Sequence, residues 1–195
     1  MPISYLFPTP VYTAMIKDED AHFEINKYMQ DLSSVDMSNP WNDTVKTTFK
    51  YKRKNCVLDQ MPTLNGIIEK HCNNFLNQLK TNRLYNHFNY IAAIEESWLN
   101  ISHQNGFQHF HIHPQCDLSG VFYHQTNCKD GDIEFLNPSL ANRLHKLTMR
   151  THIFPILPEK GKIIIFPNFL EHRVHVNCTE SARISLAFNA NANKI

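Results

Sequence analysis

Residues 161–189 read GKIIIFPNFLEHRVHVNCTESARISLAFN, and this stretch decides the fold. An apolar run over 163–166 ends at Pro167, and a short turn leads to His172, which begins a second extended segment. From Arg183 onward the residues alternate, with Arg183 and Ser185 on one face of a strand and Ile184, Leu186 and Phe188 on the other. An arginine on the inner face of an apolar strand is unfavourable unless an anion pairs with it. The stretch therefore predicts consecutive β-strands around a site for an anion.

Short strands of the same kind run through the second half of the chain. The sequence predicts strands over 118–124, 132–136, 151–157, 162–167, 173–176 and 182–189, separated by Asn, Asp, Gly and Pro turns. A strand that includes Trp98 precedes them, with one face formed by Ile94, Glu96, Trp98 and Asn100. Many short strands with almost no helical pattern are typical of an antiparallel sandwich or an open barrel.

The first half of the chain has a different pattern. We expect an opening strand over 4–16, an irregular polar stretch over 33–60, and between them a helix over 19–32 with these residues facing inward: Phe23, Tyr28, Met29 and Leu32. From Pro62 apolar residues recur every three or four positions, which predicts a helix with one buried face: Leu64, Ile67, Ile68, Cys72, Phe75, Leu76 and Leu79. The 195 residues predict a single domain, 1–195, with a helical front end over about 1–90 and a barrel core over about 91–190.

Composition and charge exclude several classes of protein. The net charge of +1 gives no broad basic field, so a nucleic-acid partner is not indicated. No run of eighteen apolar residues exists, and the first twenty residues lack the pattern of a signal peptide, so we expect no membrane partner. Five cysteines without a CxxC pair favour reduced thiols in the cytoplasm over a disulfide framework.

Histidine is the residue type that stands out, with twelve in the chain and five of them between His103 and His124. The segment NGFQHFHIHP (105–114) places His109, His111 and His113 two residues apart, so in a strand their rings point to one side and could share a metal ion. A polar strand that faces solvent would give the same pattern. His172 and Arg183, eleven residues apart, make the metal site the more specific interpretation.

These motifs, in this order, resemble the Fe(II)- and 2-oxoglutarate-dependent oxygenases, and among them the group found in bacteria and phages. The resemblance runs from about Trp98 to Asn189 and rests on four motifs: HIHP (111–114), SGVFY (119–123), FPNFLEHRVHVN (166–177) and RISLAFN (183–189). It implies a mostly β fold with flanking helices and a double-stranded β-helix core of the jelly-roll, cupin-like kind. It also implies that Fe(II) and 2-oxoglutarate are cofactors, with O2 as the second co-substrate.

The resemblance also assigns roles to individual residues. By position, His111 matches the first iron ligand and His172 the distal one, while Arg183 with Ser185 matches the clamp for the far carboxylate of 2-oxoglutarate. The middle ligand is an acid in the wider superfamily, and here either His113 or Asp117 could take its place; the HxHP form favours His113. Two further residues on strand faces are candidates for binding 2-oxoglutarate: Tyr123 and Asn100.

The function implied is that of an oxidoreductase, a dioxygenase that hydroxylates a substrate and releases succinate and CO2. Two alternatives use the same histidines: a cupin-like metal-binding protein, and a three-histidine dioxygenase that does not use 2-oxoglutarate. The position of Arg183, eleven residues after His172, favours the 2-oxoglutarate-dependent dioxygenase over both alternatives, because a protein that binds only a metal has no need of an inward arginine there. An exposed opening strand could also pair two copies of the chain into a homodimer.

Overall fold

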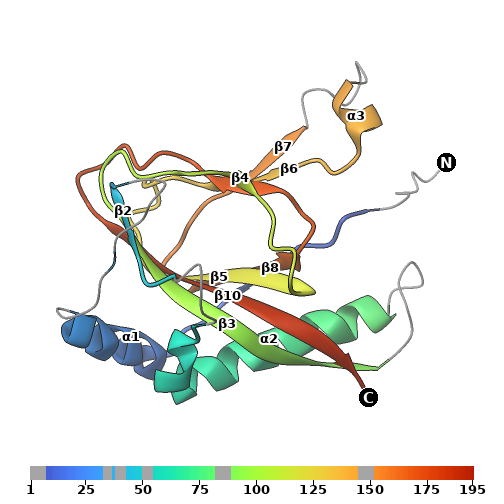
Figure 1. Ribbon diagram of the computed structural model, residues 1–195, viewed down its shortest axis with the longest axis horizontal. Helices are drawn as coiled ribbons and strands as arrows, with labels where there is room; N and C mark the ends of the chain where they lie inside the picture. Colours follow the sequence, from blue (N-terminus) through green and yellow to red (C-terminus); the bar gives the residue numbers. More distant parts are fainter. Residues whose placement is uncertain (1–7, 33–36, 38–42, 50–54, 82–88, 145–151) are drawn as a thin grey trace.

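The computed structural model describes residues 8–32, 37, 43–49, 55–81, 89–144 and 152–195, and it consists of two β-sheets with two longer helices on one side (Figure 1). The large sheet has the strand order β1 (Tyr12–Met15), β8 (Lys162–Pro167), β5 (Leu118–Gln125), β10 (Arg183–Lys194), β3 (Tyr90–Ser102) and β2 (Val45–Thr47). The small sheet has the order β4 (Gln108–His111), β9 (His172–Val174), β6 (Ile133–Leu136) and β7 (Ile153–Ile156). Neighbouring strands are antiparallel throughout both sheets.

The helices α1 (Glu19–Asp31) and α2 (Pro62–Thr81) cover the outer face of the large sheet, and the short 3-10 helix η2 (Val57–Gln60) directly precedes α2 (Figure 1). Side chains satisfy the free N–H groups at their first turns: Asp18 accepts from the N–H of Ala21, and Glu24 on α1 accepts from the N–H groups of Thr63 and Leu64 on α2. The Glu24 bonds therefore fix the angle between the two helices. A third helix, α3 (Leu140–Leu144), follows β6.

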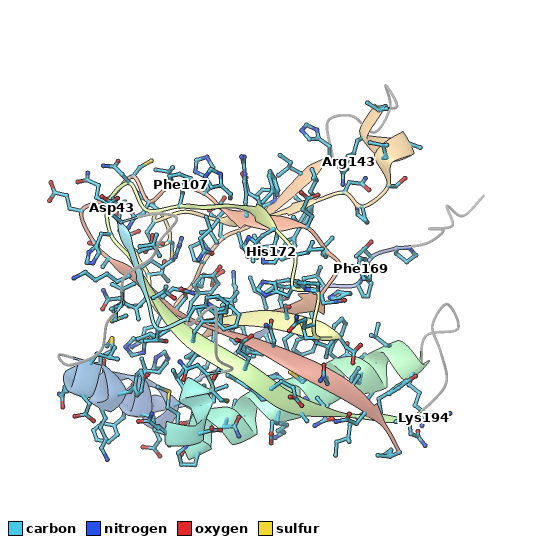
Figure 2. All side chains as sticks on the ribbon, viewed as in Figure 1. Asp43, Phe107, Arg143, Phe169, His172 and Lys194 are labelled. Carbon is cyan, nitrogen blue, oxygen red and sulfur yellow. The ribbon has the colours of Figure 1, made fainter. Side chains whose placement is uncertain are left out.

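Two apolar cores lie on the two faces of the large sheet. The main core packs α1, η2 and α2 against outward residues of β3, β5, β8 and β10, among them Leu99, Phe122 and Phe188. A smaller core lies between the sheets, where Phe166 of β8 packs on Phe135 of β6. Figure 2 shows that side chains also occupy the space between the sheets, where His172 is labelled. The predicted double-stranded β-helix core is confirmed.

The predicted buried face of the first helix is wrong at one position. Phe23 is 65% exposed, whereas Ala21 and Ile25 are buried and Tyr28 packs against the main core. The buried stripe follows steps of three and four residues from Ala21, and Phe23 lies nearly opposite it on the helix. The second helix is confirmed over Pro62–Thr81, with four fully or almost fully buried residues: Leu64, Ile68, Cys72 and Phe75.

Two further expectations differ from the structure. The stretch 33–60 is not irregular throughout, because it contains β2 and η2 and so adds an edge strand to the large sheet. On β3 the pairing with β10 shifts between Glu96 and Ile94, which is a bulge at Glu95. Ile94 therefore packs with the main core and does not share a face with Glu96.

The opposite edge of the large sheet is β1, which covers only Tyr12–Met15 of the opening strand predicted over 4–16, because residues 8–11 are described but form no strand. Residues 4–7 of that strand lie outside the described residues. Pairing of two copies through this edge stays a prediction. None of the helices in the described ranges combines the length and the apolar composition needed to cross a bilayer.

Candidate active site

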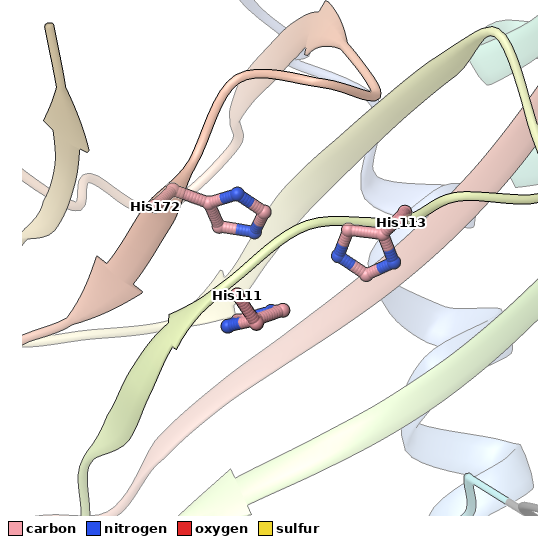
Figure 3. A group of neighbouring side chains, drawn as sticks. All are labelled: His111, His113 and His172. Atoms are coloured by element: carbon pink, nitrogen blue, oxygen red, sulfur yellow. The ribbon is translucent and has the colours of Figure 1, made fainter. Parts of the chain in front are cut away.

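Three histidines from the small sheet converge in the space between the sheets (Figure 3). His111 ends β4 and pairs directly with His172, the first residue of β9, while His113 follows β4 by two residues. One ligand atom from each ring lies within 4.8 Å of the others. The ring of His113 also stacks on Trp98 of β3, with 5.7 Å between centroids, so the group touches the large sheet as well.

Backbone carbonyls set the tautomers of two of these rings. Nδ1 of His111 lies 2.7 Å from the carbonyl oxygen of His109, and Nδ1 of His172 lies 2.9 Å from that of Leu170. Because a carbonyl oxygen only accepts, both Nδ1 atoms carry the proton and donate it, and the lone pair of each ring is left on Nε2. Metal-binding histidines commonly have this arrangement, with the second nitrogen bonded to a backbone carbonyl.

Burial keeps the three rings uncharged. It lowers the pKa of His172 to about 3 and the pKa of His113 to about 4, and it also lowers the pKa of His111. The neighbouring rings depress the pKa values of His113 and His172 further, because positive charges so close together repel. At neutral pH the group offers three neutral imidazoles, which suits a divalent first-row metal ion.

Asp117, the predicted alternative to His113, is held away from this group. Its carboxylate accepts a hydrogen bond of 2.8 Å from the backbone N–H of Ala192 on β10. Among the described His, Cys, Asp and Glu side chains, only His111, His113 and His172 form a group of three with ligand atoms this close together. The structure thus brings together the three-histidine set and not the set that contains the carboxylate.

Arg183 begins β10 and is 4% exposed. Its Nη1 donates hydrogen bonds of 2.7 Å to the carbonyl oxygens of Asp130 and Gly131, which fix the guanidinium. No carboxylate of a described residue lies within 4.0 Å to form an ion pair with it. Burial lowers the pKa of Arg183, but a guanidinium keeps its charge in proteins. A fixed, buried cation without a carboxylate partner favours the binding of an anion.

The other three predicted 2-oxoglutarate residues lie beside Arg183 on the inner face. Asn100, Ser185 and Tyr123 are paired across β3, β10 and β5, and all three are buried. Thr47 donates a hydrogen bond of 2.7 Å to Oδ1 of Asn100, which turns the amide NH2 group to a side without a described partner. Burial raises the pKa of Tyr123 to about 12, so its hydroxyl stays neutral and can donate.

A cavity of about 920 Å³ joins the histidines to this cluster of donors. All seven of these predicted residues line it, and so does Ser102, whose buried hydroxyl has no hydrogen-bond partner among the described residues. An unpaired hydroxyl inside a protein is unfavourable, so a ligand or water is expected to bond to it. The chemistry of the cavity therefore fits a metal ion on one wall and an anionic group at the Arg183 end.

Sequence reasoning missed several residues of the cavity. Trp98 was placed on a strand but given no role, and Glu96 lines the cavity beside Asn189 without having been singled out. The carbonyl groups of Asp130 and Gly131 that hold Arg183 carry no signal in the sequence, because any residue has a carbonyl. The inward face of the Trp98 strand was the available signal for Trp98 and Glu96.

A comparison with protein-family models matches residues 96–189 to the family described as "Putative 2OG-Fe(II) oxygenase". Residues 96–189 belong to the 2OG-Fe(II) oxygenase family. The match covers the histidine group, Arg183 and the other predicted 2-oxoglutarate residues, and it confirms the resemblance seen in the sequence. Oxygenases of this family take Fe(II) and 2-oxoglutarate, so the prediction of these two cofactors is confirmed. No curated protein sequence matches the chain.

Solved structures of similar fold include several 2-oxoglutarate enzymes. HygX from Streptomyces hygroscopicus, solved with nickel and 2-oxoglutarate bound, has a TM-score of 0.61 at 11% identity, with 94% of this chain and 83% of that chain covered. A Pseudomonas putida prolyl-4-hydroxylase has a TM-score of 0.59 at 10% identity, covering 94% and 92%. The epimerase SnoN from nogalamycin biosynthesis has a TM-score of 0.65 at 9% identity, covering 94% and 78%. At these identities the likeness shows the fold alone.

Proposed function

We propose that this oxygenase hydroxylates a C–H bond of its primary substrate and releases succinate and CO2 from 2-oxoglutarate. The observation that carries the proposal is the arrangement of the cavity: three neutral imidazoles converge on one wall, and at one end lies a buried arginine that has no carboxylate partner among the described residues. A protein that binds only a metal ion has no use for this arginine. The same residues therefore argue against both alternatives that do without 2-oxoglutarate.

In this proposal His111, His113 and His172 hold the iron through their neutral rings. The carbonyl oxygens of His109 and Leu170 keep Nδ1 protonated on two of them, so the Nε2 lone pairs of these two rings would be available to hold the metal. Three imidazoles leave the metal centre more positive than two imidazoles and a carboxylate. A dianionic co-substrate bound to the iron offsets that charge directly.

Arg183 binds the far carboxylate of 2-oxoglutarate, and the fork of the guanidinium suits two parallel hydrogen bonds. Further donors come from the next inward position of β10 and its partners on the neighbouring strands: Ser185, Tyr123 and the amide of Asn100. The bound iron and 2-oxoglutarate supply the activation of O2, which no side chain provides. The chain contributes orientation and an apolar wall, since Ile133, Phe166 and Val174 also line the cavity and exclude water.

Anaerobic titration tests the assignment. Metal-free protein is titrated with Fe(II) and then with 2-oxoglutarate, and the visible charge-transfer band of chelated 2-oxoglutarate is followed. We expect the band in the wild type and its loss in His172→Ala. His175→Ala is the matched control, because His175 is exposed and does not line the cavity, and this variant should keep the band. Iron binding without uptake of 2-oxoglutarate would show that the clamp assignment is wrong.

Hydroxylation is tested separately from cofactor binding. Once a substrate has been found, turnover under ¹⁸O2 should give a product that carries one labelled oxygen atom, with one succinate formed for each product. A product of unchanged composition, as an epimerase would give, contradicts hydroxylation but leaves the iron and 2-oxoglutarate assignments in place.

A further inference from the structure

The inner face of the large sheet forms a ladder of paired residues with opposite charges at its two ends. Each rung is one inward residue of β10 together with its partners on the neighbouring strands, and the four rungs are those of Arg183, Ser185, Ala187 and Asn189. In the fourth rung Asn189 is paired with Glu96 of β3 and Ser119 of β5. A strand rises about 3.3 Å per residue, so the ladder from Arg183 to Asn189 is roughly 20 Å long. The cation of Arg183 and the carboxylate of Glu96 are thus at opposite ends of one cavity.

The candidate metal ligands lie between these two ends. Trp98 occupies the third rung, opposite Ala187, and the ring of His113 stacks on it at 5.7 Å. If the proposed function holds, 2-oxoglutarate would extend from the metal toward Arg183 and occupy the space beside the first two rungs, those of Arg183 and Ser185. The part of the cavity beyond Trp98, at Glu96, is then left for the primary substrate.

The carboxylate of Glu96 is oriented by a short chain of hydrogen bonds. Asn189 donates from Nδ2 to Oε2 of Glu96 at 3.1 Å, and Ser119 donates to Oδ1 of Asn189 at 3.0 Å. Ser119 and Asn189 are both buried, so this chain has little freedom to rearrange. One oxygen of the carboxylate keeps acceptor capacity without a described partner. Glu96 thus offers a fixed acceptor to a bound molecule.

The surroundings of Glu96 favour a positive ligand. Among the described residues that line the cavity, the only lysine or arginine is Arg183, at the far end, and Glu95, at the bulge in β3, lines the cavity as well. The aromatic rings of Trp98 and Phe49 line the same region, with their centroids 5.0 Å apart. Aromatic faces attract organic cations and also pack against an apolar stem.

We propose that the primary substrate carries a positively charged nitrogen group, an ammonium or a guanidinium, and that Glu96 binds this group while Trp98 packs against the adjoining carbon chain. The inference rests on the proposed function, because it takes the Arg183 end of the cavity to be filled by 2-oxoglutarate. Charge-assisted hydrogen bonds to a carboxylate held in place give the selectivity. An anionic group at the same point meets repulsion from Glu96.

Three compounds of the same length and different charge test the proposal: n-hexylamine, n-hexanol and hexanoate. Their binding is measured by saturation-transfer NMR on metal-free protein, and by the change in the visible band of the Fe(II) and 2-oxoglutarate complex without oxygen. Saturating 2-oxoglutarate keeps hexanoate away from Arg183. We expect n-hexylamine to bind about tenfold more tightly than n-hexanol, the size of effect usual for a hydrogen bond to a charged group, and hexanoate to bind most weakly.

Variants of Glu96 identify the residue responsible. In Glu96→Gln the preference for the amine over the alcohol should fall to about threefold or less, because a neutral hydrogen bond is roughly half as strong. Glu96→Lys should reverse the order and favour hexanoate. Glu180→Gln removes the same charge from an exposed residue outside the cavity and should keep the preference of the wild type.

The two readouts separate this inference from the proposed function. If the visible band forms but n-hexanol or hexanoate binds as tightly as n-hexylamine, or if none of the three binds, the inference about Glu96 is overturned and the proposed function stands. An unchanged preference in Glu96→Gln overturns it too. If the band never forms while the amine is still preferred, the proposed function fails and the cation site is supported.

Discussion

Arg183 has no carboxylate of a described residue within 4.0 Å, and its removal gives the first prediction. In Arg183→Ala the far carboxylate of 2-oxoglutarate loses a charge-assisted pair of hydrogen bonds, for which about 2–3 kcal/mol is a usual loss. We therefore expect the Kd for 2-oxoglutarate to rise by a factor of about 30 to 140, while Fe(II) binding stays largely intact. Anaerobic titration of each ligand measures both constants. An equal loss of metal and co-substrate binding in a folded variant would contradict the assigned role.

Replacing Tyr123 should weaken 2-oxoglutarate binding less than replacing Arg183. Burial raises the pKa of its hydroxyl to about 12, so the group is a neutral donor at every pH at which the protein is assayed. Tyr123→Phe removes one neutral hydrogen bond, so we expect the Kd for 2-oxoglutarate to rise by a factor of about 2 to 12. The factor should be the same at pH 7 and pH 9. A factor that grows at high pH would mean that the hydroxyl ionises, contrary to its buried position.

Individual site residues could be predicted where local periodicity decides them. The alternation after Arg183 placed Arg183 and Ser185 on the inner face, and the structure pairs Ser185 with Asn100 and Tyr123 there. The choice between His113 and Asp117 could not be made locally, because it depends on the backbone of β10. There the N–H of Ala192 holds the Asp117 carboxylate, seventy-five positions along the chain.

Bulges in two strands place side chains in ways that the alternating pattern does not reveal. A shift of one residue moves every later side chain to the other face of a sheet, and the bulge at Glu95 moves Ile94 and Ala92 into the main core. A second shift, where Ile184 pairs with Gln125 but Ser185 with Tyr123, leaves His124 as the extra residue on β5. Because a bulge is selected by the neighbouring strand, the sequence of one strand alone does not reveal it.

The turn before β6 holds Arg183 in place, and a glycine there is required by geometry. Gly131 has a φ of +100°, and a Cβ on it would lie 2.1 Å from the carbonyl oxygen of His175 and 3.0 Å from Nη1 of Arg183. Gly131→Ala should therefore destabilise the protein by about 1–3 kcal/mol and weaken 2-oxoglutarate binding as Arg183 shifts. Urea unfolding and ligand titration measure the two effects.

Gly66→Ala is the control for that substitution. Gly66 is exposed inside α2, and nothing lies within 4 Å of the added methyl group. This variant should be more stable than the wild type by about 0.5–1 kcal/mol, because alanine has the higher helix propensity. Equal unfolding free energies for the two variants would mean that the turn tolerates a side chain and that Arg183 is held in another way.

The helical layer and the β-helix are joined by a pair of buried histidines. Nδ1 of His22 on α1 lies 2.9 Å from Nδ1 of His124 on β5, and Nε2 of His124 lies 3.0 Å from Oδ1 of Asn26. The amide oxygen accepts from Nε2, so Nδ1 of a neutral His124 accepts in turn from His22. This chain of bonds needs His124 uncharged, because a protonated His124 has no lone pair on Nδ1 to accept from His22. The contact forms only when α1 packs on β5, so the sequence predicts the helix and the strand but not the pairing of His22 with His124.

Acid should therefore loosen the whole molecule, which is the last prediction. Burial lowers the pKa of His124 to about 4 and also lowers the pKa of His22, whereas both protonate near 6.5 in the unfolded chain. Between these values the unfolded state binds more protons, so stability is complete above about pH 6.5 and falls as the pH drops toward 4.

The double variant His22→Gln with His124→Gln should have a Tm lower by about 3–8 °C at pH 7.5, because it loses the buried bonds. Its Tm should then fall less than that of the wild type between pH 7.5 and pH 5, and since His111, His113 and His172 remain in both metal-free proteins, their contribution to the slope cancels in the comparison. Thermal unfolding followed by circular dichroism at both pH values gives the two slopes, and equal slopes would show that the pair is not what links stability to pH.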